Sequence, residues 1–219
     1  MYSGVLFDWD GTLADTRKVI LVSFQQALHT ISVKTDTNFI ERQIGTGAAE
    51  TFKTILKKAG KPYDETIIKR LIDEKVKAEI KLTREVKLFP GAKELLVELQ
   101  GNTKLALASM NNRRVIDELL RNMDIEDCFN TVVTVEDVEK FKPDPEIFLK
   151  AAAKLKLSPL ECVVLEDSLF GVQAAKAAKI ACIAVITGVY NKAELERGNP
   201  ELVVKSLREK EKILKFILH

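Results

Sequence analysis

The sequence has little cysteine, few aromatic residues and no long apolar run. Only three of its 219 residues are cysteines, and aromatic residues make up 6%. An odd number of cysteines in a chain of this size does not indicate a disulfide framework, so we expect small core residues in a reducing, cytoplasmic setting. No stretch approaches the ~20 apolar residues of a membrane-spanning helix, and the first residues lack a signal-peptide pattern. The sequence therefore predicts a cytoplasmic protein without a membrane partner.

An excess of one charge is also absent. The chain has 34 Lys and Arg against 32 Asp and Glu, which gives no whole-chain electrostatic case for nucleic acid as a partner. At 46% hydrophobic residues, it has enough core formers to fold, as a monomer or small homo-oligomer. Its two histidines, His29 and His219, are not near a cysteine in the sequence, so neither a thiol hydrolase nor a zinc site is supported.

Short apolar runs separated by helical periodicity are the main signal of secondary structure. Such runs are typical of buried parallel strands, and their alternation with helices predicts βαβ units. The expected strands are Gly4 to Phe7, Lys104 to Ala108, Thr131 to Thr134, Cys162 to Leu165, Ala181 to Ile186 and Leu202 to Val204. The predicted fold class is α/β, with a Rossmann-like, doubly wound parallel sheet.

Residues 16–87 interrupt this pattern, because only helical periodicity is readable there. Three apolar stripes begin at Ile20, Phe52 and Ile68, and Phe89-Pro90-Gly91 indicates the turn that returns to the sheet. We therefore expect a core of residues 1–15 and 88–219 with a small all-helical cap domain, 16–87, inserted into it. The insert carries 15 Lys and Arg against 9 Asp and Glu. This basic character indicates either solvated helix faces or a role in steering anionic substrates.

Two aspartates follow the first expected strand. Side chains alternate along a strand, so Asp8 and Asp10 share a direction, and Gly11 permits a sharp turn after them. In an open α/β sheet, ligands bind at this carboxyl end. Two adjacent carboxylates resist joint ionisation without a cation, and magnesium suits a site with few carboxylates plus a substrate phosphate. An exposed turn capped by Asp side chains is the alternative interpretation.

Polar residues near the other expected strand ends favour a ligand-binding site at Asp8 and Asp10 over an exposed turn. Ser109 follows the second strand of the sheet, Lys142 precedes a predicted helix that begins near Pro145, and Glu166 and Asp167 follow a later strand. A hydroxyl, an ammonium group and further carboxylates are thus all expected at one edge of the sheet. Each could separately be a turn former, an exposed lysine or a helix cap.

Taken together, these motifs resemble the haloacid dehalogenase superfamily, and in particular its phosphatase and phosphomutase branch with a helical cap. The resemblance covers essentially the whole chain in the right order. It is carried by Asp8-Trp9-Asp10-Gly11-Thr12, Phe89-Pro90-Gly91, Ser109, Lys142-Pro143-Asp144-Pro145 and Leu165-Glu166-Asp167-Ser168, followed by Gly171-Val172-Gln173-Ala174-Ala175.

The resemblance implies a role for each matching residue. Asp8 would be the nucleophile that forms an aspartyl phosphate, and Asp10 the general acid and then the base. Thr12, Ser109 and Lys142 would bind phosphate or offset its charge. Mg²⁺ would be held by Asp8, Asp10, Asp167 and Glu166, the last as a ligand or as a partner of the ligands.

Members of this branch have one of two activities on a small phosphorylated metabolite, phosphate ester hydrolysis or phosphomutase activity. Asp10 provides the acid that dehalogenases of the family lack, so phosphate ester hydrolysis is favoured. Sugar phosphomutases such as β-phosphoglucomutase commonly carry a histidine where this chain has Ile20, and an arginine in the cap loop. Here that loop contains Gly45, Thr46 and Gly47, which more resembles phosphoglycolate phosphatase-like members and is expected to select the substrate. A phosphomutase, or a catalytically silent module that binds a phosphorylated metabolite, remains an alternative.

Overall fold

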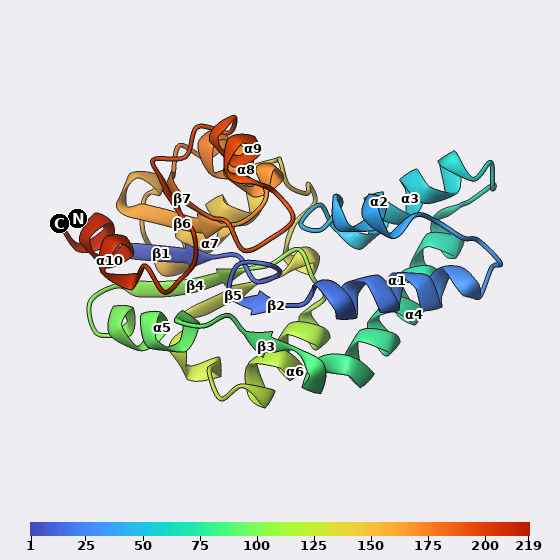
Figure 1. Cartoon of the computed structure of the whole chain (residues 1–219), viewed down its shortest axis with the longest axis horizontal. Coiled ribbons are helices and arrows are strands. Elements are labelled where there is room, and N and C mark those ends of the chain that lie inside the picture. The colour runs from blue at the N-terminus through green and yellow to red at the C-terminus, as the bar shows by residue number, and fades with distance from the viewer.

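The computed structural model describes all 219 residues and contains a six-stranded parallel sheet with a group of helices beyond one end of it (Figure 1). The strands are β1 (Gly4–Phe7), β4 (Lys104–Ala108), β5 (Thr131–Val133), β6 (Cys162–Glu166), β7 (Ala181–Val185) and β8 (Leu202–Val204). Their order across the sheet is β5-β4-β1-β6-β7-β8. The chain therefore winds outward from β1 in both directions, which confirms the predicted doubly wound sheet.

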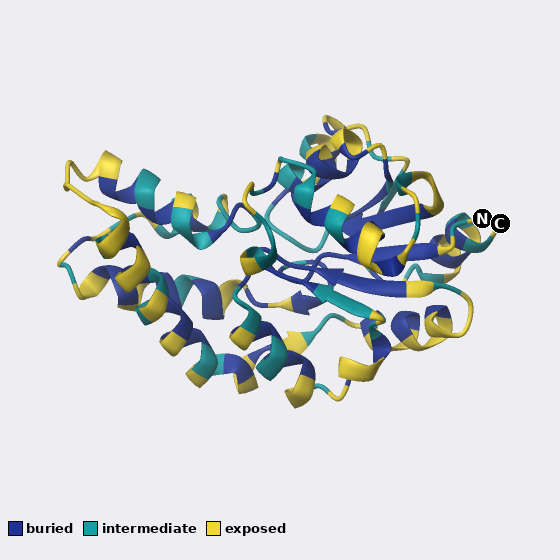
Figure 2. Ribbon diagram, turned by 180° about the vertical axis from the view of Figure 1, so that it is seen from behind, coloured by how far each residue is buried: buried dark blue, intermediate teal, exposed yellow.

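Helices cover both faces of this sheet (Figure 1). Alternate strand residues face opposite sides, so Val5 and Phe7 lie in one apolar core while Leu6 lies in the other. The first core is completed by α5 (Ala92–Gln100), α6 (Arg113–Asn122) and α10 (Lys210–Leu218). The second is completed by α7 (Glu146–Leu155), α8 (Leu169–Ala177) and α9 (Lys192–Glu196). The strands are buried on both faces (Figure 2), which explains their continuous apolar runs.

The inserted residues form four helices with a core of their own. These are α1 (Arg17–His29), α2 (Thr37–Glu41), α3 (Ala48–Lys58) and α4 (Glu65–Leu82). Their buried apolar residues form a separate cluster in which Phe24 and Phe52 are in contact, with ring centroids 4.7 Å apart. In the views of Figures 1 and 2 these helices extend away from the sheet. We call residues 16–87 the cap and the remainder the core.

A short two-stranded sheet at the junction of cap and core was not predicted. The strands β2 (Ala14–Asp15) and β3 (Lys87–Leu88) pair in antiparallel fashion, Ala14 opposite Leu88. Each has only two residues, too few for a periodic signal. Short 3₁₀ helices span Thr83–Glu85, Glu126–Cys128, Val135–Asp137 and Pro159–Glu161. The last begins at a capping box formed by Ser158 and Glu161.

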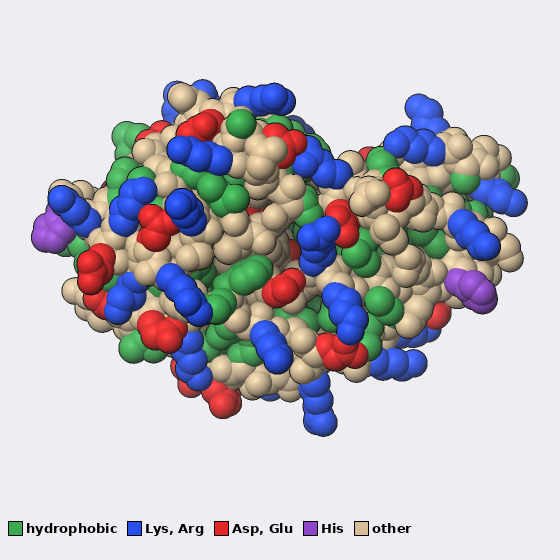
Figure 3. Space-filling model, in the orientation of Figure 1, with side chains coloured by type: hydrophobic (Ala, Val, Ile, Leu, Met, Phe, Trp, Pro, Cys, Tyr) green, Lys and Arg blue, Asp and Glu red, His purple; other side chains and the backbone are tan.

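Three further expectations can be compared with the structure. The cysteines Cys128, Cys162 and Cys182 are buried and unpaired. No helix has the length and apolar character to cross a membrane. On the face shown in Figure 3, Lys and Arg side chains are scattered over cap and core and interspersed with Asp and Glu, which favours solvated helix faces for the basic cap.

Candidate active site

The register of the sheet brings the predicted strand ends to one level. Phe7 of β1 pairs with Leu107 of β4 on one side and with Leu165 of β6 on the other. The residues that follow these three, Asp8, Ala108 and Glu166, therefore lie next to one another at the carboxyl ends of their strands. All of the site lies at the carboxyl edge of the parallel strands, facing the cap.

Lys142 lies between two carboxylates at this edge. Its Nζ donates to Oδ1 of Asp8 at 2.6 Å and to Oε1 of Glu166 at 2.7 Å, and its side chain has no exposed surface. Burial by itself lowers the pKa of a lysine, but the charges of Asp8 and Glu166 outweigh it and raise the pKa of Lys142 above its ordinary value. Lys142 therefore stays protonated and compensates part of the buried negative charge.

Three buried carboxylates converge at the same place. One oxygen each from Asp8, Glu166 and Asp167 lies within 4.8 Å of the others. Burial raises the pKa of Asp8 to about 8, and the charges of Glu166 and Asp10 add to this against the effect of Lys142. Burial also raises the pKa of Asp167. Three carboxylates with one ammonium partner leave excess negative charge, so this donor set fits a hard divalent cation.

The carboxylate of Asp167 is held by neighbours on several sides. The hydroxyl of Thr12 donates to its Oδ1 at 2.9 Å. Gly11 and Gly188 press closely against it: a Cβ atom on Gly188 would lie 1.7 Å from its Oδ2, and one on Gly11 would lie 2.3 Å away. Only glycine permits these approaches, and Gly11 also has a φ of +89°. The geometry of Asp167 is thus determined before any ligand binds.

Both carboxylate oxygens of Glu166 accept hydrogen bonds from other residues of the protein. Oε1 accepts from Lys142, while Oε2 accepts from the backbone N–H and hydroxyl of Ser168 at 2.7 and 2.9 Å. A Cβ atom on Gly171 would lie 1.7 Å from Oε1, so α8 also packs directly on this carboxylate. This arrangement favours the second predicted alternative, in which Glu166 orients other site residues.

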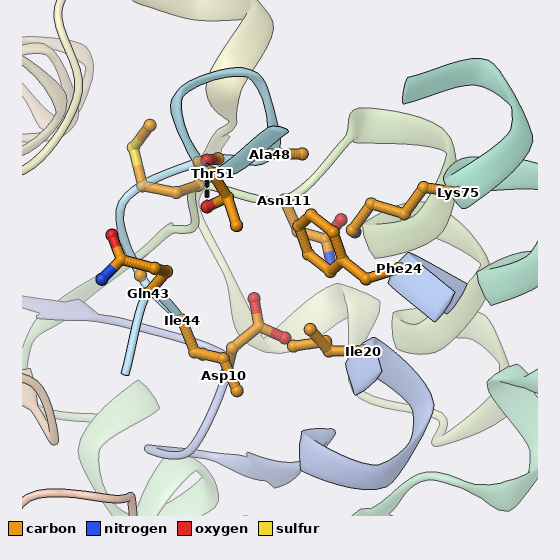
Figure 4. Close-up of a pocket in the computed structure, with 12 residues that line it drawn as sticks. Asp10, Ile20, Phe24, Gln43, Ile44, Ala48, Thr51, Lys75 and Asn111 are labelled. Atoms are coloured by element: carbon orange, nitrogen blue, oxygen red, sulfur yellow. Dashed lines mark hydrogen bonds between the residues drawn. The ribbon is translucent and has the colours of Figure 1, made fainter. Parts of the chain in front are cut away.

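Asp10 is directed away from this group. Its side chain lines a cleft of about 320 Å³ between core and cap, and Figure 4 shows it pointing into that cleft opposite Phe24 and Lys75. Burial and then the charge of Glu79 raise the pKa of Asp10 to about 6. Its Oδ1 is buried and has no hydrogen-bond partner. Although the sequence also predicted Asp10 as a metal ligand, its carboxylate does not belong to the converging group.

Ser109 is fully buried beside the site, where its Oγ accepts from the backbone N–H of Asn111 at 3.1 Å. In the predicted cap loop, Gly45 and Gly47 line the cleft with φ values of +97° and +96°. Thr46 does not line it, because its hydroxyl donates to the carbonyl of Gln43 at 2.8 Å. The loop lies against the core: a Cβ on Gly47 would be 3.4 Å from Met110. The cap is therefore closed over the site.

Comparisons with known proteins agree with this geometry. The family model described as "Haloacid dehalogenase-like hydrolase" matches residues 5–185. The chain belongs to this family. It is 32% identical to a phosphorylated carbohydrates phosphatase of Thermotoga maritima, over 94% of this chain and 98% of the relative, and 34% identical to a β-phosphoglucomutase of Bacillus subtilis, over 84% and 83%.

Solved structures place the hydrolase in the same group. The crystal structure of a hydrolase from Pseudomonas syringae has a TM-score of 0.90 at 27% identity and covers 98% of this chain and 99% of that chain. A β-phosphoglucomutase from Clostridium difficile has a TM-score of 0.87 at 27% identity, with all of both chains covered. The prediction of an enzyme from the phosphatase and phosphomutase branch is confirmed.

One polar network of the hydrolase was missed by sequence reasoning. Lys75 and Glu79 form a buried ion pair on α4, with Nζ and Oε2 2.5 Å apart, and Oε1 of Glu79 accepts from the side-chain amide of Asn111 at 3.3 Å. The network thus joins the cap to the core loop after β4. Its signal was in the sequence: Lys75 lies four residues after Leu71, so two charges i and i+4 apart continue the apolar stripe of that helix.

A second cleft opens on the other side of Asp10. It has a volume of about 550 Å³ and reaches from Asp10 and Asp167 to the loop after β7. In that loop, the Thr187 hydroxyl donates to the carbonyl of Gly11 at 2.6 Å, and the Tyr190 hydroxyl donates to the carbonyl of Arg42 in the cap at 3.0 Å. No sequence motif indicated this loop, because its hydroxyl groups meet Gly11 and Arg42 only in the folded chain.

Proposed function

We propose that this hydrolase is a magnesium-dependent phosphatase, acting on a small phosphorylated metabolite of the phosphoglycolate or sugar phosphate type. The observation that carries the proposal is the buried group of Asp8, Lys142, Glu166 and Asp167 beside the free carboxylate oxygen of Asp10. Phosphoryl transfer depends mainly on positioning and on neutralisation of charge. Residues that can position a phosphoryl group and residues that can neutralise its charge both lie at one edge of the sheet.

Asp8 is the proposed nucleophile. Its Oδ1 is held by Lys142, so the other oxygen is available for attack on phosphorus to form an aspartyl phosphate. Lys142 balances the charge that collects on Asp8 and the phosphoryl group, and Glu166 holds Lys142 in place. Ser109 is proposed to bind a phosphoryl oxygen. Thr12 faces Asp167, so we propose that it orients that carboxylate, and phosphate binding by Thr12 stays a prediction.

Asp10 is the proposed acid and base. Its side chain lines the cleft in which the leaving group would lie, and its buried Oδ1 has no hydrogen-bond partner in the protein. A pKa raised to about 6 suits a carboxyl group that gives a proton to the leaving oxygen and then removes one from water. Asp8 and Asp10, which lie in different surroundings, are thus proposed to carry out nucleophilic attack and proton transfer respectively.

Asp8 and Asp167 are the residues that would hold Mg²⁺. Glu166 is proposed to orient the site by accepting hydrogen bonds from Lys142 and from the backbone N–H of Ser168, without binding the ion itself. When bound, the ion supplies charge neutralisation for the phosphoryl oxygens and allows both carboxylates to stay ionised. The raised pKa of Asp8 without a cation supports this assignment.

Residues 16–87 are proposed to act as a cap that opens for substrate and closes to exclude bulk water. The short β2–β3 ladder marks where the chain passes between cap and core. The loop of Gly45, Thr46 and Gly47 lies over the cleft and is proposed to contribute to substrate selection. A phosphomutase is the second candidate, supported by the two similar β-phosphoglucomutases. Ile20 lines the cleft where such enzymes commonly carry histidine, which favours hydrolysis.

The direct test is phosphate release from 4-nitrophenyl phosphate and a panel of phosphorylated metabolites, with Mg²⁺ and with a chelator. We expect release only with Mg²⁺, and a loss of at least about 10³-fold in Asp8→Asn with an unchanged circular dichroism spectrum. Asp73→Asn, an equally conservative change at an exposed site on α4, should retain full activity. Wild-type activity in Asp8→Asn would overturn the mechanism. Binding without release identifies a silent module, and isomerisation that depends on a sugar bisphosphate identifies a mutase.

A further inference from the structure

The cations that line the two clefts are each paired with a carboxylate of the protein. The cap-side cleft of about 320 Å³ contains only two charged residues, Asp10 and Lys75. The cleft of about 550 Å³ contains three carboxylates and one cation, Arg17. The organic part of a substrate would lie in these spaces next to Asp10, and the cap-side cleft, whose free room is only about 30 Å³, must widen to admit it. The state of Lys75 and Arg17 therefore decides which substrates are accepted.

Lys75 is not available to a second anionic group. Its ammonium group is paired with Glu79 at 2.5 Å, and the two side chains are 6% and 2% exposed. Its Nζ also lies 5.3 Å from the centroid of the Phe24 ring. Glu79 is held in turn by the amide of Asn111. Because the pair is one helical turn apart on α4, the cap folds with this charge already neutralised.

Arg17 is also paired, with Glu41 of α2, but 55% of its side-chain surface is exposed, so this pair holds its cation less firmly than the buried pair holds Lys75. The neighbouring cation of the cap loop, Arg42, pairs with Glu194 of the core at 2.6 Å and lies against the Tyr190 ring. No cation lining either cleft thus lacks a carboxylate partner. Lys142 is fully buried and committed to Asp8 and Glu166, so it serves the phosphate that reacts.

The rest of the cap-side cleft is uncharged. Its other side chains are polar or apolar, and one of the polar groups, the hydroxyl of Thr51, already donates to the carbonyl of Gly47 at 3.0 Å. The polar ones are Gln43, Thr51 and Asn111, and the apolar ones are Ile20, Phe24, Ile44, Ala48 and Met110. Such a lining suits a hydroxylated, uncharged skeleton. A second carboxylate or phosphate would instead lie near Asp10 and Glu79 without a free counter-charge.

Given the phosphatase activity proposed above, we propose that the substrate is a polyol or sugar monophosphate without a second anionic group, and that Glu79 enforces this selection by neutralising Lys75. The inference narrows the proposed function: it excludes phosphoglycolate and sugar bisphosphates as good substrates. It also disfavours the mutase, which must hold a bisphosphate.

The test compares substrates of equal chain length that differ in one terminal group. Glycerol 3-phosphate is paired with 3-phosphoglycerate, and glucitol 6-phosphate with 6-phosphogluconate. Each compound is measured as a substrate and as a competitor of 4-nitrophenyl phosphate hydrolysis, so that binding is measured even where turnover is slow. We expect the alcohol of each pair to have the higher kcat/KM and the lower inhibition constant. Equal or better use of the acid in either pair overturns the inference.

Glu79→Gln tests the role of the ion pair. The amide keeps the size of the side chain and one acceptor oxygen in place of the two that bind Lys75 and Asn111, and it removes the negative charge, so the charge of Lys75 becomes available to a substrate anion. We expect the ratio of alcohol to acid kcat/KM to fall by about tenfold. The matched control is Glu74→Gln, which breaks the exposed Glu74–Lys77 pair on the same helix and should leave the ratio unchanged.

The outcomes separate the two proposals. If Glu79→Gln lowers both kcat/KM values equally, Glu79 has only a structural role and its part in selection is wrong. If the wild-type enzyme hydrolyses 4-nitrophenyl phosphate but prefers the acids, the substrate class is wrong while the phosphatase stands. If no phosphate is released from any compound with Mg²⁺ present, the proposed function itself has failed.

Discussion

The hydroxyl of Thr12 donates a hydrogen bond of 2.9 Å to Oδ1 of Asp167, a residue 155 positions later in the chain. Both side chains are buried, and the bond joins the loop after β1 to the loop after β6. It fixes which oxygen of Asp167 faces Thr12 and leaves Oδ2 on the side of Gly188. A proposed metal ligand is thereby oriented by a residue from the first motif.

Loss of this hydrogen bond is expected to weaken metal binding. Thr12→Val keeps the shape of the side chain and removes the donor, and changes to such supporting groups typically cost ~10- to 100-fold in metal affinity. The magnesium concentration for half-maximal activity should therefore rise by at least about tenfold. Thr12→Ser, which retains the hydroxyl, is the control. An unchanged magnesium requirement in Thr12→Val contradicts the proposed role of Asp167.

The close approach of Gly188 to Asp167 predicts a second effect. Gly188→Ala would place Cβ 1.7 Å from Oδ2, so the carboxylate or the loop after β7 must move. We expect activity at saturating substrate to fall by about 100-fold or more, since displacements of about 1 Å at a site can have such effects. Gly101→Ala, where a Cβ meets nothing within 4 Å, should have no effect on phosphate release.

Asp10→Asn should separate the two halves of the reaction. A 4-nitrophenolate leaving group needs little help from an acid, whereas attack by water on the aspartyl phosphate still needs a base. We expect a burst of 4-nitrophenol followed by slow turnover, and a mass increase of one phosphoryl group on the peptide that contains Asp8. Release without a burst and without phosphorylated peptide contradicts the assignment of Asp10 as base.

The stability of the metal-free protein should depend on pH in a specific direction. Burial raises the pKa of Asp8 to about 8 and of Asp10 to about 6, above the value of 3.8 for an ordinary aspartate. The folded state therefore binds more protons than the unfolded state, and stability is lost as pH rises from about 4 to 8. By contrast, the pKa of Asp137 is lowered to about 2, so its contribution changes only at acid pH.

Thermal unfolding at pH 5 and pH 8 measures this dependence. We expect Tm to fall between these values with a chelator present, and to fall less with Mg²⁺, because the cation stabilises the ionised carboxylates. The same comparison on Asp8→Asn should show a smaller fall, since one of the titrating groups is absent. A Tm that rises toward pH 8 without a cation contradicts the burial argument.

Much of the fold could be predicted because its signals are local. The six core strands are continuous apolar runs buried on both faces, and the cap helices carry apolar stripes, so their positions follow from periodicity. Some observed strand ends differ by one residue from the predicted ones: the strand predicted to end at Leu165 extends to Glu166. The β2–β3 ladder could not be predicted, because a pair of two-residue strands is defined only by its partner.

The sequence by itself determined which residue types follow the strands of the parallel sheet, and hence that Asp8, Glu166 and Asp167 meet at one edge. That follows from strand direction and alternation, which are properties of the backbone. Only the tertiary structure decided what each side chain contacts: that Asp10 turns into the cleft, that Thr12 faces Asp167, and that Glu79 neutralises Lys75. These contacts depend on burial and on close packing between segments far apart in the chain, which no local pattern records.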